Sequence, residues 1–155
     1  MSALSISGIS EIVLSVRDLD RMKSFYQEVL GFGLVNETSF DRDGNRVPDG
    51  APTISFLKIS DIESPVGQRC HPQVLVLIDH RRHPSGRVGH AVETSTLHHL
   101  AFEIPHHAYD GNLAKLRKLA LDPREVAFPA IHAKSIFFED PEGNSLELIC
   151  PDSSN

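Results

Sequence analysis

The first half of the chain alternates short apolar segments with one amphipathic stretch. Residues 9–16 are β-branched and alternate weakly, which predicts a strand. Asp18 or Asp20 is a candidate N-cap for a helix whose apolar side chains recur at helical spacing until Gly31 stops it. Three further strands are predicted over residues 32–36, 53–59 and 73–78. The predicted order is β-α-β-β-β, with a turn-rich loop over residues 41–50.

The second half repeats this order after a polar, histidine-rich connector. A helix is predicted over residues 109–121, with apolar positions at Leu113, Leu116, Leu119 and Ala120. Strands are predicted over residues 97–104, 125–128, 134–139 and 145–150. The pattern predicts an α+β fold of two βαβββ modules in a single domain, residues 1–155. Its parts are module one at about 7–79, the connector at about 80–95 and module two at about 96–151.

Composition narrows the class of protein. The chain has 155 residues, 40% of them hydrophobic, and this length suits one domain with a substantial core. A net charge of −6 without a basic run argues against a nucleic-acid partner. The apolar runs are too short for a membrane span and the N-terminus lacks signal-peptide features, so we expect a cytoplasmic protein without a membrane partner. Its two cysteines, Cys70 and Cys150, are expected to be free thiols.

The closing segment carries the first candidate for chemistry. Asp140-Pro-Glu-Gly-Asn144 predicts a tight turn, because proline presets φ and glycine and asparagine tolerate positive φ. In the strand that follows, Leu146 and Leu148 face one way and Glu147 faces the other. A carboxylate in an otherwise apolar strand is costly when buried without a partner, and a metal ion is one candidate partner. The alternative is a carboxylate that faces water at the end of the strand.

Two further polar residues open predicted strands. Superposing the first strand of each module places Glu11 and His99 at the same phase of the alternation. The neighbouring His98 is expected to face the opposite way, as an ordinary surface histidine. His80, His83 and His90 in the connector are expected to lie in a flexible, solvated loop, and His132 in another loop.

Three segments in order resemble the vicinal-oxygen-chelate superfamily, which includes glyoxalase I, extradiol dioxygenases, methylmalonyl-CoA epimerase and the bleomycin-resistance proteins. They are VRDLDRMKSFY with LGF (residues 16–26 and 30–32), LHHLAFEI (97–104) and FEDPEGNSLEL (138–148). The resemblance implies paired βαβββ modules whose mixed sheets curl around a cleft. It also implies a metal site. The positions that match the family's ligands are Glu11, Gln73, His99 and Glu147, with His71 competing with Gln73.

Two carboxylates, an imidazole and an amide suit a divalent first-row ion with open water positions: Fe, Mn, Ni, Zn or Co. The resemblance therefore implies a metal-dependent lyase or isomerase of the glyoxalase or epimerase type. Such an enzyme acts through an enediolate on a small substrate with vicinal oxygens. Glu147 or Glu11 is the candidate catalytic base. The family also implies a homodimer.

Two alternatives stay open. An extradiol-type dioxygenase would share the histidine doublet, but here Glu11 replaces its first-strand histidine, Gln73 its acid-base histidine and Phe137 its tyrosine. A metal-free small-molecule binding protein of the bleomycin-resistance type would lack the ligand set, of which this chain keeps at least His99 and Glu147.

Overall fold

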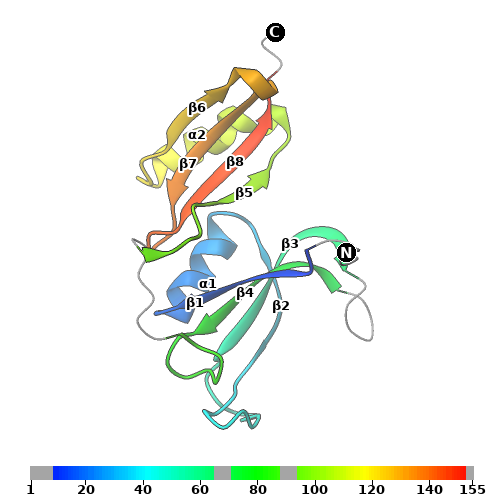
Figure 1. Ribbon diagram of the computed structural model, residues 1–155, viewed down its shortest axis with the longest axis vertical. Coiled ribbons are helices and arrows are strands. Elements are labelled where there is room, and N and C mark those ends of the chain that lie inside the picture. Colours follow the sequence, from blue (N-terminus) through cyan, green and yellow to red (C-terminus); the bar gives the residue numbers. More distant parts are fainter. Residues whose placement is uncertain (1–8, 65–70, 88–93, 153–155) are drawn as a thin grey trace, which may run out of the picture. The chain divides into compact units, whose positions relative to one another are not determined.

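The structure is a computed structural model that describes residues 9–64, 71–87 and 94–152. It divides the chain into two compact units, residues 1–89 and 90–155. Among the described residues, each unit contains one four-stranded mixed sheet and one α-helix in the order β-α-β-β-β, so the predicted α+β fold of two βαβββ modules is confirmed (Figure 1). Within the described part of the chain, none of the helices has the length and apolar character needed to span a membrane.

The first unit has the strand order β1-β4-β3-β2, in which β1 runs parallel to β4 and the other pairs are antiparallel. Its elements are β1 (Glu11–Val16), α1 (Leu19–Glu28), β2 (Gly33–Thr38), β3 (Ile54–Ser64) and β4 (His71–Asp79).

The helix α1 begins where the sequence predicts it. The Asp18 side chain accepts a hydrogen bond from the Arg21 backbone N–H at 3.0 Å and so caps the helix. Its buried side chains are Leu19, Met22, Phe25 and Tyr26, and the helix packs against β3 and β4. This contact buries one face of the sheet, which carries Leu57, Leu75 and Leu77.

The second unit has the equivalent strand order β5-β8-β7-β6, with β5 parallel to β8. Its strands and α-helix are β5 (Leu100–Glu103), α2 (Tyr109–Lys118), β6 (Arg124–Phe128), β7 (Ala133–Glu139) and β8 (Ser145–Pro151). Two short 3-10 helices, η2 (His106–Ala108) and η3 (Pro129–Ile131), lie between them.

Two boundaries in this unit differ from the prediction by three residues. The strand β5 begins at Leu100, three residues later than expected, so His98 and His99 precede the strand and the alternation of strand faces does not govern them. The helix α2 ends at Lys118 because Ala120 adopts a left-handed φ of 54°. Leu119, predicted as an apolar core position of the helix, is consequently exposed.

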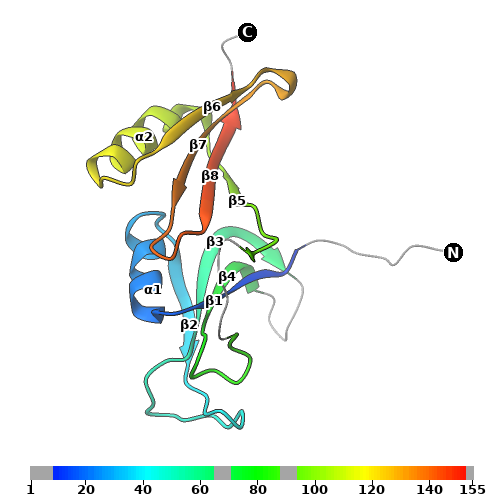
Figure 2. The same cartoon turned by 60° about the vertical axis from the view of Figure 1, so that its left-hand side comes forward.

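The two faces of the second sheet differ in chemistry. One face buries Ile136, Leu146 and Leu148. Lys134 lies on the same face of β7 and its Nζ atom is 4.2 Å from the centre of the Tyr109 ring, so α2 packs on this side. Figure 2 shows α2 alongside the sheet. The other face carries Ser135, Phe137 and Glu147, since Phe137 is the cross-strand partner of Glu147 and side chains alternate along β7. The turn before β8 holds Glu147 in this register.

That turn has the predicted form. The Asp140 carboxylate accepts hydrogen bonds from the backbone N–H groups of Glu142 and Asn144 and from the Asn144 amide, at 3.0, 2.9 and 2.8 Å. Gly143 has a φ of 85°, which glycine adopts without strain. Residues 41–45 form a turn with the same signature, in which Asp41 accepts from Asp43, from the Asn45 backbone and from the Asn45 amide.

Candidate metal centre

Glu147 lies in the middle of β8 and is 4% exposed. Its two carboxylate oxygens have different partners. The Ser135 hydroxyl donates to Oε1 at 2.5 Å, and the His99 Nε2 atom lies 3.0 Å from Oε2. Ser135 reaches Glu147 from β7 because it lies on the same face as Phe137, the cross-strand partner of Glu147. One oxygen is thus fixed by the sheet and the other faces an imidazole.

His99 is held from two sides. Its Nδ1 atom lies 2.7 Å from the Nδ1 atom of His98, and the two rings meet edge to face with centroids 5.0 Å apart. On another side its ring meets the Phe137 ring edge to face at 5.5 Å. The prediction that His98 faces away from His99 is therefore wrong. It assumed an extended strand at residues 98 and 99, where β5 has not yet begun.

The compensation for the buried Glu147 charge comes from a hydroxyl and an imidazole. Of the ion pairs among the described residues, the one that includes Glu147 has His99 as its partner, and a lysine or arginine does not take part. Histidine is cationic only when protonated. Burying a carboxylate without a permanent cation is costly, and a bound cation would remove that cost.

A pocket of about 310 Å³ adjoins the two histidines within the second unit. It lies beside the start of β8. Its lining residues are Ser95, Leu97, His98, His99, Glu139, Gly143, Asn144 and Ser145. The His99 imidazole therefore borders both the buried Glu147 and an open volume the size of a small molecule.

Glu11 and Gln73, the two predicted ligands from the first unit, do not converge on one face of their sheet. Glu11 is the cross-strand partner of Val74, so its side chain shares a face with Val74, and Gln73 faces the other side. The Gln73 amide oxygen accepts a hydrogen bond from the Ser60 hydroxyl at 3.1 Å. Glu11 is exposed. The side chain of His71, the competitor of Gln73, lies outside what the structure describes.

Strand register shows how the first unit differs from the second at the candidate ligand positions. Superposing Glu11 on His99 aligns β4 with β8 so that Val74 matches Ser145 and Val76 matches Glu147. The position in the first unit that corresponds to Glu147 is therefore an apolar residue, not Gln73. Ligand roles for Glu11 and Gln73 stay predictions from the family resemblance.

The residues present in the second unit fit a divalent ion. Two ligand atoms at right angles on an octahedral ion, each about 2.1 Å from it, are about 3.0 Å apart, which matches the distance from His99 Nε2 to Glu147 Oε2. Nitrogen and carboxylate oxygen are ligands that first-row ions accept. Among the described residues, three histidine, cysteine, aspartate or glutamate side chains do not gather into a complete site. His99 and Glu147 could supply two ligands of a metal site, and such a site would need further ligands.

Sequence reasoning missed Ser135. A serine within an apolar strand is an ordinary occurrence, and only the pairing of β7 with β8 reveals that its hydroxyl meets Glu147. The signal that could have found it is its spacing from Phe137, two positions away and therefore on the same face of the strand.

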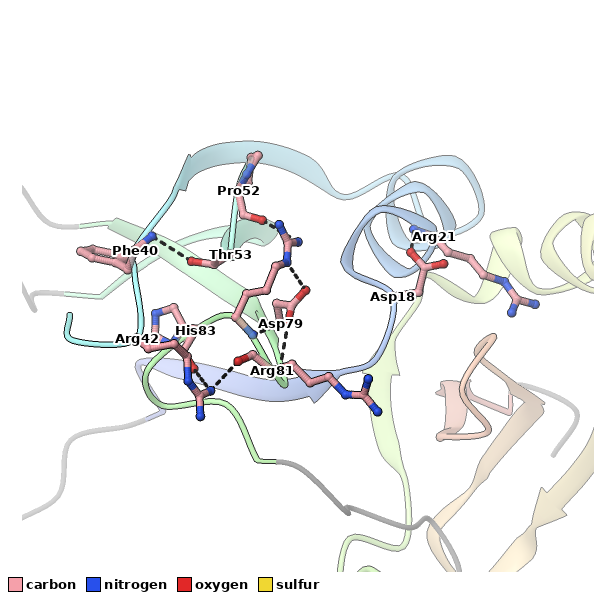
Figure 3. A network of polar contacts seen from close by, with 10 residues as sticks. Asp18, Arg21, Phe40, Arg42, Pro52, Thr53, Asp79, Arg81 and His83 are labelled. Atoms are coloured by element: carbon pink, nitrogen blue, oxygen red, sulfur yellow. Dashed lines mark hydrogen bonds and ion pairs between the residues drawn. The ribbon is translucent and has the colours of Figure 1, made fainter. Parts of the chain in front are cut away.

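The described start of the connector, residues 80–87, is arranged around another buried carboxylate, Asp79. Asp79 accepts hydrogen bonds from the backbone N–H groups of Arg81 and Arg82 and from the Arg82 guanidinium (Figure 3). Gly86 is required here, because a Cβ atom at this position would lie 2.5 Å from the Asp79 carbonyl oxygen. The predicted flexible, solvated loop is therefore wrong for His83, which is buried. His80 is half-buried, His132 is exposed as expected, and His90 lies outside the described residues.

Comparison with known proteins agrees with this architecture. A model of the Glyoxalase/Bleomycin resistance protein/Dioxygenase superfamily matches residues 8–148. A glyoxylase/bleomycin resistance protein/dioxygenase domain from Frankia sp. EAN1pec is 21% identical, with a TM-score of 0.68 and coverage of 97% of this chain and 96% of that one. A search of curated proteins finds no match.

Two further solved structures share the fold. The fosfomycin resistance protein FosX from Listeria monocytogenes, in complex with Mn(II) and sulfate, is 20% identical with a TM-score of 0.60, and the match covers 94% of this chain and 93% of that one. Lactoylglutathione lyase from Agrobacterium tumefaciens is 21% identical with a TM-score of 0.57, and the match covers 92% of each chain.

Proposed function

The chain belongs to the Glyoxalase/Bleomycin resistance protein/Dioxygenase superfamily, and on this premise we propose that it is a metal-dependent enzyme of the lyase or isomerase type. Its substrate is a small molecule with two adjacent oxygens. The observation that carries the proposal is the buried Glu147 carboxylate, with Oε1 fixed by Ser135 and Oε2 placed 3.0 Å from His99 Nε2.

Each residue has a distinct proposed role. His99 Nε2 and Glu147 Oε2 hold the metal, and Glu11 is the third ligand that the family resemblance implies. A bound divalent ion would polarise a carbonyl oxygen of the substrate and so acidify the neighbouring C–H group. Glu11 is the better candidate to accept that proton, because Ser135 restrains Glu147 whereas Glu11 is exposed. Gln73 is the weaker ligand candidate, since it faces the other side of its sheet.

Ring cleavage by an extradiol-type mechanism receives less support. Phe137 occupies the position beside His99 with an aromatic ring that carries no hydroxyl group, so it supplies no proton donor there. Metal-free binding of an antibiotic is also less well supported, because such a protein would have no need for a buried carboxylate facing an imidazole.

The metal is tested first. We expect tag-free protein to bind Mn(II), the ion present in the L. monocytogenes FosX complex, or another divalent first-row ion, in isothermal titration and in elemental analysis. Glu147→Gln should weaken binding at least about 100-fold. Glu103→Gln is the matched control, since Glu103 is an exposed glutamate near the end of β5 in the same unit. Wild-type protein that binds none of these ions would exclude the enzyme and favour the binding protein.

The reaction type is tested without knowing the substrate. The metal-loaded protein is incubated in D₂O with small α-hydroxy and α-keto compounds, and loss of the α-proton signal is followed by NMR. Exchange that needs both metal and Glu11 supports the proposed chemistry. Oxygen consumption with catechols and Fe(II), without such exchange, would support the dioxygenase instead.

Light scattering on the same sample tests the expected homodimer.

A further inference from the structure

We propose that His98 is a positioning residue whose Nδ1 lone pair selects the tautomer of His99 that binds metal. The inference rests on the proposed function, because it assigns a role to a neighbour of the proposed ligand. Its starting point is the 2.7 Å separation between the Nδ1 atoms of His98 and His99.

Two nitrogen atoms at this distance share one hydrogen. Either His98 Nδ1–H donates to His99 Nδ1, or His99 Nδ1–H donates to His98 Nδ1. In a neutral imidazole the choice at Nδ1 determines the state of Nε2. When His99 Nδ1 accepts, its Nε2 carries hydrogen and donates to Glu147 Oε2, 3.0 Å away. This arrangement satisfies both residues without a metal.

The opposite arrangement suits a metal ion. When His99 Nδ1 carries the hydrogen, Nε2 presents a lone pair toward the Glu147 carboxylate. Two electron-rich atoms 3.0 Å apart repel each other unless a cation binds both. Metal binding therefore reverses the direction of the hydrogen bond between His98 and His99. His98 stabilises the loaded form by accepting that hydrogen.

The surroundings of His99 give His98 this role. The described contacts of the His99 ring are His98 at Nδ1, Glu147 at Nε2 and Phe137 at the ring edge. Phe137 offers no acceptor, so the Nδ1 partner among the described residues is His98. His98 itself is exposed, and water can satisfy its Nε2 whichever tautomer it adopts. Partners of this kind typically change metal affinity by about 10- to 100-fold.

Two substitutions of His98 test separately whether the hydrogen-bond acceptor or the aromatic ring is needed. His98→Asn keeps an oxygen close to the position of Nδ1, whereas His98→Phe keeps a ring and removes the acceptor. Zn(II) is the probe, because it is diamagnetic and accepts nitrogen and oxygen ligands. We expect His98→Phe to bind Zn(II) about 10- to 100-fold more weakly than wild type and His98→Asn to stay within about threefold. Thermal melts of the metal-free variants should coincide with the wild type.

NMR reads the tautomer directly. In wild-type protein labelled with ¹⁵N-histidine and loaded with Zn(II), the His99 Nδ1 should have the shift of a protonated nitrogen and Nε2 that of a metal-bound one. The inference would be overturned if His98→Phe bound Zn(II) as tightly as the wild type does. It would also be overturned by an unprotonated His99 Nδ1 in the loaded protein, or by a His98→Asn variant that binds Zn(II) as weakly as His98→Phe. If the wild type binds no metal, the proposed function fails as well. Tight binding by both wild type and His98→Phe refutes only the role of His98.

Discussion

Each sheet buries one carboxylate on its described strands, and the two are stabilised in different ways. Asp79, at the end of β4, is 6% exposed, and Glu147, within β8, is 4% exposed. Asp79 accepts the Arg82 Nε–H at 2.8 Å and two backbone N–H groups at 3.0 and 2.8 Å. Glu147 meets a hydroxyl and an imidazole. Burial alone therefore does not indicate a metal site. The informative feature is a buried carboxylate on a strand that meets a hydroxyl and an imidazole in place of a guanidinium and backbone N–H groups.

The same contrast extends across the two sheets. At positions equivalent by register, the second sheet carries Glu147, Phe137 and Ser135, and the first carries Val76, Phe56 and Ile54. The aromatic residue is common to both, and the polar residues occur in the second sheet alone. The two modules thus share one fold and differ at the positions of the proposed ligand Glu147 and its hydroxyl partner Ser135.

The largest expected effect concerns stability in the first unit. Asp79→Ala leaves the Arg82 guanidinium and two backbone N–H groups without their acceptor, so the free energy of unfolding should fall by about 2–3 kcal/mol. Urea denaturation of metal-free protein measures it. Asp49→Ala is the control, an exposed aspartate in the loop before β3, and should change stability by less than about 0.5 kcal/mol. Metal affinity should not change. If it falls together with stability, Asp79 and Glu147 do not have separate roles.

The corresponding change in the second unit should leave the free energy of unfolding unchanged or raise it. In the double variant Ser135→Ala, Glu147→Leu, a buried hydroxyl and carboxylate are both replaced by apolar groups. Such replacements are neutral or stabilising, so metal-free protein should gain about 0–2 kcal/mol in free energy of unfolding. It should also lose metal binding. A loss of stability as large as that of Asp79→Ala would mean that Glu147 is a structural residue, like Asp79.

A smaller effect is expected when only the hydroxyl is removed. Ser135→Ala frees Glu147 Oε1 from its restraint, so metal affinity should fall about 10-fold in isothermal titration. Ser55→Ala is the matched control. Ser55 is likewise fully buried on a strand, and its hydroxyl donates to Glu37 at 3.3 Å in the first unit. It should bind metal as the wild type does. Equal losses in both variants would point to a general effect of buried serines on folding.

Local patterns in the sequence predict much of this molecule. The Asp18 cap, the turn at residues 140–144 and the face occupied by Glu147 follow from interactions between residues close in the chain. The hydroxyl of Ser135 could not be assigned, because its contact depends on how β7 pairs with β8. The contact of His98 with His99 depends on where β5 begins, and strand ends are set by pairing with β8. Pairing with the next strand is not encoded by local periodicity.

The smallest expected effect is on the pH dependence of stability, and it arises from His83 in the first unit. His83 is buried next to Phe40, and this burial lowers its pKa, although the negative charge of Asp79 acts in the opposite direction. Because the folded pKa lies below the unfolded value of about 6.5, the unfolded chain binds a proton more tightly. The contribution of His83 to stability should therefore be fully present above pH 6.5 and be lost as the pH decreases from there through the folded pKa.

His83→Asn keeps an acceptor near the Nδ1 position that receives the Ser85 N–H at 3.1 Å, and it cannot titrate. Urea midpoints of metal-free protein between pH 5 and 8 should show a shallower slope for this variant than for the wild type. An unchanged slope would assign the pH dependence to histidines outside this loop.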